Sequence, residues 1–196
     1  RGPLSSARYR IAAAGNSNYG WFGGGYIFPA SISKSVDRID FSNDSATASP
    51  RAFLTTFRSN SAATGNSNYG WFGAGLTTGP AVLSTVDRVD FSNDSVTALA
   101  RGSLTLARAS LAATGNSNYG WFGGGSFGTP TSISSRVDRI NFSNDLTKYL
   151  TKSRHWRQVK FATNPHGFLF KRGNKAERVV HDRINQSGIT ILVNAF

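Results

Sequence analysis

Apolar and polar positions alternate along short stretches of this chain, and the same alternation returns every 50 residues. In the first copy, an apolar run at residues 11–14 leads into the sequence GNSN, and the aromatic stretch YGWF at 19–22 follows before three glycines. Gly and Asn favour tight turns, and aromatic residues favour strands. The pattern therefore predicts a β-hairpin in each copy.

Two further strands are predicted in each copy. After a loop whose sequence varies, the apolar residues Val36, Ile39 and Phe41 predict a third strand. The sequence SND then supplies a second turn, and residues 45–49 (SATAS) suit a fourth, outer strand. Each copy is therefore expected to form a four-stranded antiparallel sheet.

The repeat covers residues 1–147, and its copies occupy about 1–50, 51–100 and 101–147. All three contain the sequence GNSNYGWFG and, later, the sequence VDR. Repeats of this length form units that cannot bury their apolar faces alone and that stack on copies of themselves. We therefore expect three stacked sheets with three equivalent, buried tryptophans: Trp21, Trp71 and Trp121.

The order of motifs in each copy resembles the kelch repeat of β-propellers. A strand ends in a pair of glycines, and a loop, a VDRID-like strand and an Arg-containing segment follow. The middle copy departs from the family pattern at Ala74, and the outer strands lack the family's tryptophan. The resemblance implies an all-β fold, a partial propeller of three four-stranded antiparallel blades, in which sheets approach closely at glycines. The positions that match the family's glycine pair are Gly23, Gly24, Gly73, Gly123 and Gly124.

Three blades are too few for a closed propeller, since closed propellers typically contain about 4 to 8. The resemblance therefore implies that further blades come from the same, longer chain or from a second copy, or that the chain is a partial propeller covered by its own tail. Because the chain starts at Arg1 and not at Met, we expect a fragment or a processed product. The repeat also resembles kelch-like arrays encoded by marine bacteriophages, which implies a structural protein in a virion or another extracellular assembly.

The composition supports a β-rich fold and narrows the chemistry. Aromatic residues make up 12% of the chain and charged residues 16%, which suits sheets and tight turns better than long surface helices. The absence of cysteine excludes disulfides, thiolate metal sites and a cysteine nucleophile. No apolar stretch approaches the length needed to span a bilayer.

The charged residues that recur in every copy favour a structural role over catalysis. A catalytic site needs one nucleophile and one base, whereas a residue present in every copy is most simply part of the scaffold. We therefore expect Asp37 and Arg38 to form charge pairs between strands, and we expect no enzyme activity and no cofactor. Arg8 and its copies either pair with aspartate or line a central channel. The DFSND sequence offers oxygen ligands for calcium, from Asp40 to Asp44, but a plain hairpin turn is favoured.

Binding function is predicted where the copies differ. The loops that follow the glycines read YIFPASISKS, LTTGPAVLST and SFGTPTSISSR, while the strands beside them stay constant. Variable loops on a rigid scaffold are typical of recognition surfaces, here for a protein or a glycan, although unconstrained loops also vary. The candidate binding residues are Phe28, Lys34, Leu83, Phe127 and Arg136.

The last 49 residues, 148–196, abandon the repeat and carry 10 Lys or Arg against 2 Asp or Glu, a net charge of +8. The sequences WRQVKF and FLFKR predict a hairpin, residues 175–186 a helix and ITILV a last strand. We expect a small basic α+β tail of the ββαβ type. An alternative function follows, in which this tail binds nucleic acid and binding weakens steeply with salt.

Overall fold

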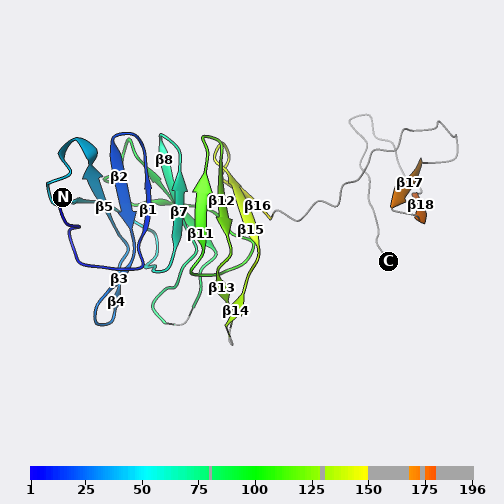
Figure 1. The fold of residues 1–196 in the computed structure, drawn as a ribbon, viewed down its shortest axis with the longest axis horizontal. Coiled ribbons are helices and arrows are strands. Elements are labelled where there is room, and N and C mark those ends of the chain that lie inside the picture. The colour runs from blue at the N-terminus through cyan, green and yellow to red at the C-terminus, as the bar shows by residue number, and fades with distance from the viewer. Residues whose placement is uncertain (80, 129–130, 150–167, 173–174, 180–196) are drawn as a thin grey trace. The chain divides into compact units, whose positions relative to one another are not determined.

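Three four-stranded antiparallel sheets form the framework of residues 1–149 (Figure 1). The computed structural model describes residues 1–149 except 80 and 129–130, and also residues 168–172 and 175–179. These residues form strands, turns and loops with a single 3-10 helix, so the expectation of a nearly all-β fold with four-stranded antiparallel sheets is confirmed. Within the described parts, no helix is long and apolar enough to cross a membrane.

The strands of each sheet follow one another in chain order, which makes each sheet an antiparallel meander. Sheet 1 contains β1 (Ala12–Gly15), β2 (Tyr19–Gly23), β5 (Ser35–Asp40) and β6 (Ser49–Phe53). Sheet 2 contains β7 (Ala62–Gly65), β8 (Tyr69–Gly73), β9 (Thr85–Asp90) and β10 (Leu99–Ser103). Sheet 3 contains β11 (Ala112–Gly115), β12 (Tyr119–Gly123), β15 (Val137–Asn141) and β16 (Leu146–Tyr149).

The outer strand of sheet 1 begins later than predicted, at Ser49, whereas the sequence suggested residues 45–49. The cause is the preceding turn, because Phe41 leaves the third strand and begins the 3-10 helix η1 (Phe41–Asn43). The Asp40 carboxylate caps this turn by accepting a hydrogen bond of 2.9 Å from the N–H two residues later. The fourth strand therefore includes the first residues of the next sequence copy.

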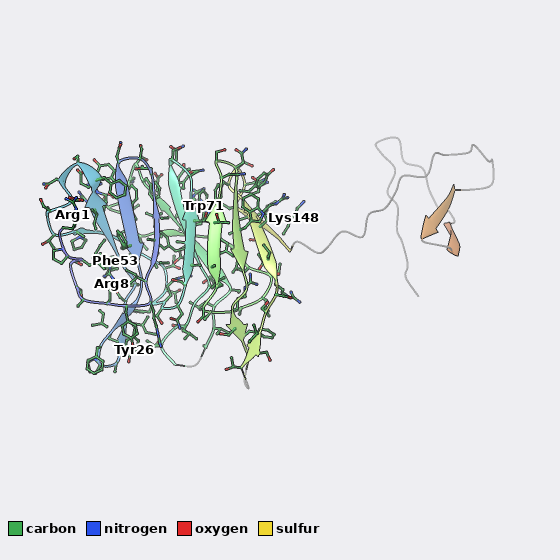
Figure 2. All side chains as sticks on the ribbon, viewed as in Figure 1. Arg1, Arg8, Tyr26, Phe53, Trp71 and Lys148 are labelled. Carbon is green, nitrogen blue, oxygen red and sulfur yellow. The ribbon has the colours of Figure 1, made fainter. Side chains whose placement is uncertain are left out.

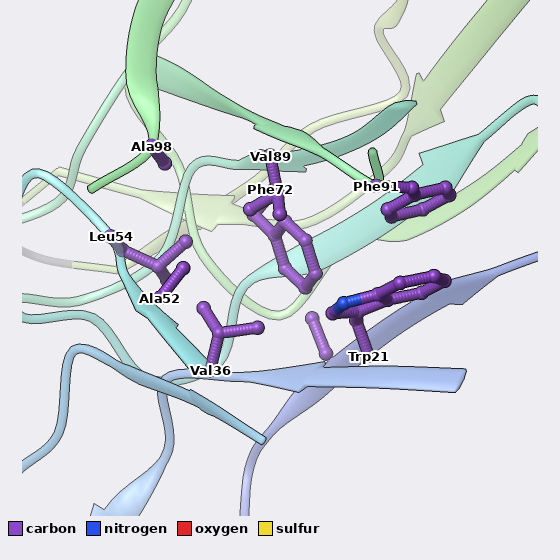
Figure 3. Packing of buried hydrophobic residues seen from close by; sticks show 9 residues of the cluster. Trp21, Val36, Ala52, Leu54, Phe72, Val89, Phe91 and Ala98 are labelled. Carbon is purple, nitrogen blue, oxygen red and sulfur yellow. The ribbon is translucent and has the colours of Figure 1, made fainter. Parts of the chain in front are cut away.

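Neighbouring sheets pack on each other through aromatic rings, and the first strands β1, β7 and β11 lie next to one another (Figure 1). Trp21 of sheet 1 stacks on Phe91 of sheet 2, with ring centroids 3.7 Å apart and planes 5° from parallel (Figure 3). Trp71 of sheet 2 stacks in the same way on Phe142 of sheet 3, at 3.9 Å. Each sheet-to-sheet junction is therefore a hydrophobic core of its own. Around Trp21 this core also contains Val36, Ala52, Leu54, Phe72, Val89 and Ala98 (Figure 3).

The two positions of the glycine pair have different roles. A Cβ at Gly23 would lie 2.8 Å from the ring of Phe72, and a Cβ at Gly73 would lie 2.8 Å from the ring of Phe122. The first position therefore lets the next sheet approach. The second position needs a left-handed backbone, with φ near +70° at Gly24 and Gly124 and 63° at the non-glycine Ala74.

Trp121 is only half buried, so the expectation of three buried tryptophans is wrong for the third copy. Trp21 and Trp71 are covered by the following sheet, whereas Trp121 lies on the face of sheet 3 that points away from sheet 2. Among the described residues, the ring of Tyr119 is the only aromatic ring beside it, tilted at 5.9 Å. Burial of each tryptophan depends on the next sheet and not on its own copy.

The chain divides into two compact units, Arg1–Thr151 and Lys152–Phe196. In the second unit the described residues form one hairpin, β17 (Phe168–Arg172) paired with β18 (Lys175–Val179). FLFKR thus pairs with residues 175–179, which the sequence assigned to a helix. The rest of the predicted ββαβ tail lies outside the described residues, so that part stays a prediction.

The stacking geometry predicts that replacing Trp21 by alanine lowers the stability of the fold more than replacing Trp121 by alanine. Trp21→Ala should lower the free energy of unfolding by about 3 to 5 kcal/mol, because it empties a closed site between two sheets. Trp121→Ala should lower the free energy of unfolding by clearly less, because the Trp121 ring is already half exposed. Urea denaturation followed by far-UV circular dichroism measures both, and equal losses would contradict the assignment of the junctions.

Candidate recognition surface

The variable loops lie along one edge of the three sheets. They connect the second strand of each sheet to the third, whereas the GNSN turns connect the first strand to the second, so the two kinds of connection lie at opposite ends of the strands. We call the end with the variable loops the loop edge and the other the turn edge. Short hairpins form at the loop edge (Figure 1): β3 (Tyr26–Ile27) with β4 (Ser31–Ile32), and β13 (Ser126–Phe127) with β14 (Ser132–Ile133).

A buried ion pair holds the chain in place beneath each variable loop. In sheet 2, Arg58 donates a hydrogen bond to Asp87 at 3.0 Å, and both side chains are fully buried. Asp87 also accepts hydrogen bonds from the N–H and the hydroxyl of Thr55. Burial lowers the pKa of the Arg58 guanidinium, and the charge of Asp87 opposes that shift. The same pair recurs as Arg8 with Asp37 at 3.1 Å and Arg108 with Asp138 at 2.9 Å.

These pairs decide between the two roles proposed for the repeated arginines. All three guanidinium groups are closed to solvent, so they do not line an open channel. The expectation of charge pairs is confirmed. The partner of Arg8 is Asp37, whereas Arg38 points to the opposite face of its strand and pairs with Asp94 of the next sheet at 3.0 Å.

Each variable loop is fixed to the scaffold where it begins. Single β-bridges join Tyr9 to Tyr26 in the first copy, and the corresponding residues in the other two, Ser59 to Leu76 and Ala109 to Ser126. The Gly25 N–H also donates to the Arg58 carbonyl of the next copy at 2.8 Å. The loop edge is therefore a set of loops whose bases are held rigidly, as recognition surfaces require.

The structure places the five predicted binding residues on this edge in different environments. Phe28, which follows β3 in the first hairpin, is 82% exposed. Lys34 lies over the rings of Phe53 and Phe57, with its ammonium 5.6 and 5.3 Å from their centroids. The other three are Leu83, Phe127 and Arg136, which are half buried.

Leu83 and Arg136 also have backbone roles in the scaffold. The Leu83 carbonyl accepts from the Arg108 N–H, and the Arg136 carbonyl accepts from the Gly124 N–H. Of the five, Phe28 of the first copy is therefore the most accessible side chain, whereas Lys34 is half buried like the other three.

Sequence reasoning missed several residues that lie beside these loops. Tyr9 packs edge to face on Tyr26 at 5.2 Å, and the guanidinium of Arg10 lies 5.1 Å from the Tyr9 ring. Figure 2 labels Tyr26 at the loop edge. We call Tyr9, Arg10 and Tyr26 the Tyr9 cluster, and Lys34, Phe53 and Phe57 the Lys34 cluster. A comparison of the copies outside the loops reveals them, because Tyr9 becomes Ser59 and Ala109 in the other copies and Phe53 becomes Ser103.

The acidic side chains at the turn edge already form hydrogen bonds or ion pairs. Asp40 Oδ1 accepts hydrogen bonds from the N–H and the hydroxyl of Ser42, and these bonds lower the pKa of the Asp40 carboxyl. Asp44 pairs with Arg1, and its copy Asp94 pairs with another sheet. These contacts support the hairpin-turn interpretation over calcium binding. Among the described residues, no three His, Asp or Glu side chains lie close enough together to hold a metal ion.

A pocket of about 340 Å³ lies at the turn edge between sheets 2 and 3. It is lined by turn residues, which include Asn66, Asn118 and Asn141. Apart from Asn141, an aspartate in the other copies, these residues are the same in every copy and form the turns' own hydrogen bonds. The pocket is therefore a poorer candidate for a specific site than the clusters at the loop edge.

Comparison of the chain with protein-family models and with curated proteins finds no match. The function of this surface is therefore argued from its own residues. Those residues are the two clusters and Phe28, all on sheet 1, the segments that adjoin it or its connection to sheet 2.

The buried ion pair in sheet 2 predicts that removing the Asp87 carboxylate destabilises the fold strongly, whereas replacing the nearby Asp90 changes its stability little. Asp87→Ala should lower the free energy of unfolding by about 3 to 5 kcal/mol, because it leaves the charge of Arg58 buried without a partner. Asp90→Asn is the matched control, since the third copy already has Asn141 there and keeps the hydrogen bonds to Ser143. Urea denaturation measures both, and a loss at Asp87 as small as the control's would contradict this role.

Proposed function

We propose that this chain is a non-enzymatic binding module, a kelch-like β-propeller segment whose loop edge recognises a protein or a glycan. The observation that carries the proposal is the gathering of exposed aromatic and basic residues at the loop edge of sheet 1, namely Tyr9, Arg10 and Phe28, at positions where the copies differ. The repeated glycine pairs, the four-stranded sheets and their face-to-face packing support the kelch-like part. A virion or another extracellular assembly is a setting in which such a module functions.

The chemistry of the two clusters favours a ligand with negative charge. Tyrosine and phenylalanine offer large contact areas at a low cost in side-chain entropy. Lys34 and Arg10 add two positive charges that already lie over aromatic rings. Acidic glycans and acidic protein surfaces combine the apolar faces and anionic groups that these residues bind.

The repeated polar residues support a binding function over catalysis. The carboxylates of Asp37, Asp87 and Asp138 are fully buried and paired with arginine, so they are closed to a substrate. The exposed carboxylate of Asp40 accepts hydrogen bonds from its own turn. The hydroxyls that donate to these carboxylates, such as those of Thr55 and Ser42, form contacts that recur from copy to copy, as expected of a scaffold.

The proposal predicts that an exchange of loops abolishes ligand binding and leaves the fold intact. Residues 26–34 and 76–84 are loops of nine residues each, between nearly identical strands, so the first can be replaced by the second without a change in length. The exchange removes Tyr26, Phe28 and Lys34 together. Wild type and variant are compared on an array of neutral and anionic glycans and on a set of acidic and basic peptides.

The expected result is binding of the wild type to anionic members of one set and its loss in the variant. The reverse exchange, in which 76–84 receives the sequence of 26–34, is the control and should keep binding. Circular dichroism checks that both variants fold. Wild-type binding that survives the first exchange, or a wild type that binds neither set, would contradict the proposal.

A further inference from the structure

The two sheet-to-sheet junctions are closed by the same set of contacts. In the first, Asp94 of sheet 2 accepts hydrogen bonds from Trp21 Nε1 at 2.9 Å and from Arg38 Nη1 at 3.0 Å, both in sheet 1. Trp21 and Arg38 sit opposite each other on neighbouring strands, so one carboxylate reaches both. The second junction repeats this arrangement with Asp145 of sheet 3, Trp71 at 2.8 Å and Arg88 at 3.0 Å.

Each junction therefore has two complementary sides. The preceding sheet supplies a donor side, made of tryptophan, arginine and the first glycine of the pair. The following sheet supplies an acceptor side, made of the aspartate, a phenylalanine that stacks on the tryptophan and a second phenylalanine that packs on the glycine. In the first junction the acceptor side consists of Asp94, Phe91 and Phe72.

Sheet 3 carries a complete donor side with no partner among the described residues. Trp121 and Arg139 sit opposite each other as Trp21 and Arg38 do. Arg139 lies over the ring of Tyr119 at 4.5 Å, nearly the distance of 4.4 Å for its copies, so its guanidinium is already positioned. Among the described residues, the space over Gly123 is open, because a Cβ there would meet only Val137, at 3.6 Å.

Sheet 1 carries the matching acceptor side on its opposite face. Phe41 is 51% exposed, whereas its copies Phe91 and Phe142 are 9% and 7% exposed within junctions. Phe22 is half buried, whereas its copies Phe72 and Phe122 are fully buried.

Asp44, the copy of Asp94, completes this side and forms an ion pair with Arg1. The main chain next to Asp44 also has the junction geometry. The Pro3 carbonyl accepts from the Ala48 N–H at 2.9 Å, as the Phe53 carbonyl of sheet 1 accepts from the Ala98 N–H of sheet 2 at 2.8 Å.

We propose that these two faces bind each other between copies of this chain. The donor side of sheet 3 in one copy receives the acceptor side of sheet 1 in another. Trp121 then stacks on Phe41, and Arg139 and Trp121 Nε1 donate to Asp44. Phe22 fills the space over Gly123.

A second copy fits both faces because it satisfies every group that either face leaves open. The positive charge of Arg139 meets the negative charge of Asp44, and the exposed rings of Phe41 and Trp121 cover each other. The existing partner of Asp44 is Arg1, whose side chain is 85% exposed. Exposed ion pairs contribute little to stability. Trp121 and Arg139 of another copy can therefore replace Arg1 as the partners of Asp44 at a small cost in free energy.

The interface has a direction, because it joins two different faces. Such head-to-tail contacts continue from copy to copy until a ring closes, or they form an open chain. Two copies supply six sheets, which lies within the range of about 4 to 8 for closed propellers. Every copy in a closed assembly uses both of its faces.

Charge reversal in the full chain tests the direction of the interface. The wild type should associate with rising concentration in sedimentation velocity. Asp44→Arg alone and Arg139→Asp alone should each remain monomeric, because every contact then joins like charges. A mixture of the two variants should associate again, because it pairs the native Arg139 with the native Asp44 and the introduced Asp with the introduced Arg.

A second variant tests the packing independently of charge. Gly123→Ala places a methyl group in open space in the single chain, so its melting temperature should match that of the wild type. The same methyl group blocks Phe22 of an incoming copy, so association should weaken at least tenfold. Gly23→Ala, in a closed junction, should instead lower the melting temperature of the chain.

Lys34→Asp separates this inference from the proposed ligand binding. It reverses a charge at the loop edge, so self-association should be unchanged while binding to an anionic ligand is lost. Asp44→Arg should show the opposite behaviour. A wild type that stays monomeric at all concentrations, a mixture that fails to associate, or association that persists in both charge variants would overturn the head-to-tail interface.

Discussion

The stacking of a tryptophan on the phenylalanine of the next sheet is the contact on which the rest of the fold depends. A four-stranded sheet of this size cannot bury its apolar side chains by itself, and the chain forms no α-helix over its described residues to cover them. The flat contact between Trp21 and Phe91 is possible because glycines in the neighbouring strands allow the sheets to approach. The hydrogen bonds to Asp94 then fix the ring and an arginine in one orientation. Stability therefore resides between the sheets as much as within them.

Local chemistry explains which parts of the fold were predictable from the sequence. The GNSN turn and the aromatic strand after it are set by neighbouring residues, and the predicted hairpin is present in all three copies. The position of the outer strand was missed, because the capping of the turn by Asp40 decides where the third strand ends. The half-buried state of Trp121 was missed for a different reason. The residues that bury Trp21 lie about 70 positions later in the chain, and Trp121 has no described sheet after it.

The candidate site was predictable only in part, for a related reason. The variable loops identify Phe28 and Lys34, because sequence differences between copies point to positions outside the scaffold. Phe53 and Phe57 come from the outer strand and the connection after it, and only the fold brings them under the Lys34 ammonium. Tyr9 likewise reaches Tyr26 through a single β-bridge. Residues that share a site but belong to different strands require the topology before they can be grouped.

Nearly identical junctions have a consequence for how this protein changes over evolutionary time. A segment of 50 residues that begins and ends at the same point of the repeat carries one donor side and one acceptor side, so its duplication or deletion recreates a junction that already works. The near-identity of the copies also favours unequal recombination in the gene that encodes them. The number of sheets is thus free to vary in whole steps, without any compensating substitution, while each new copy brings one more loop whose sequence can diverge.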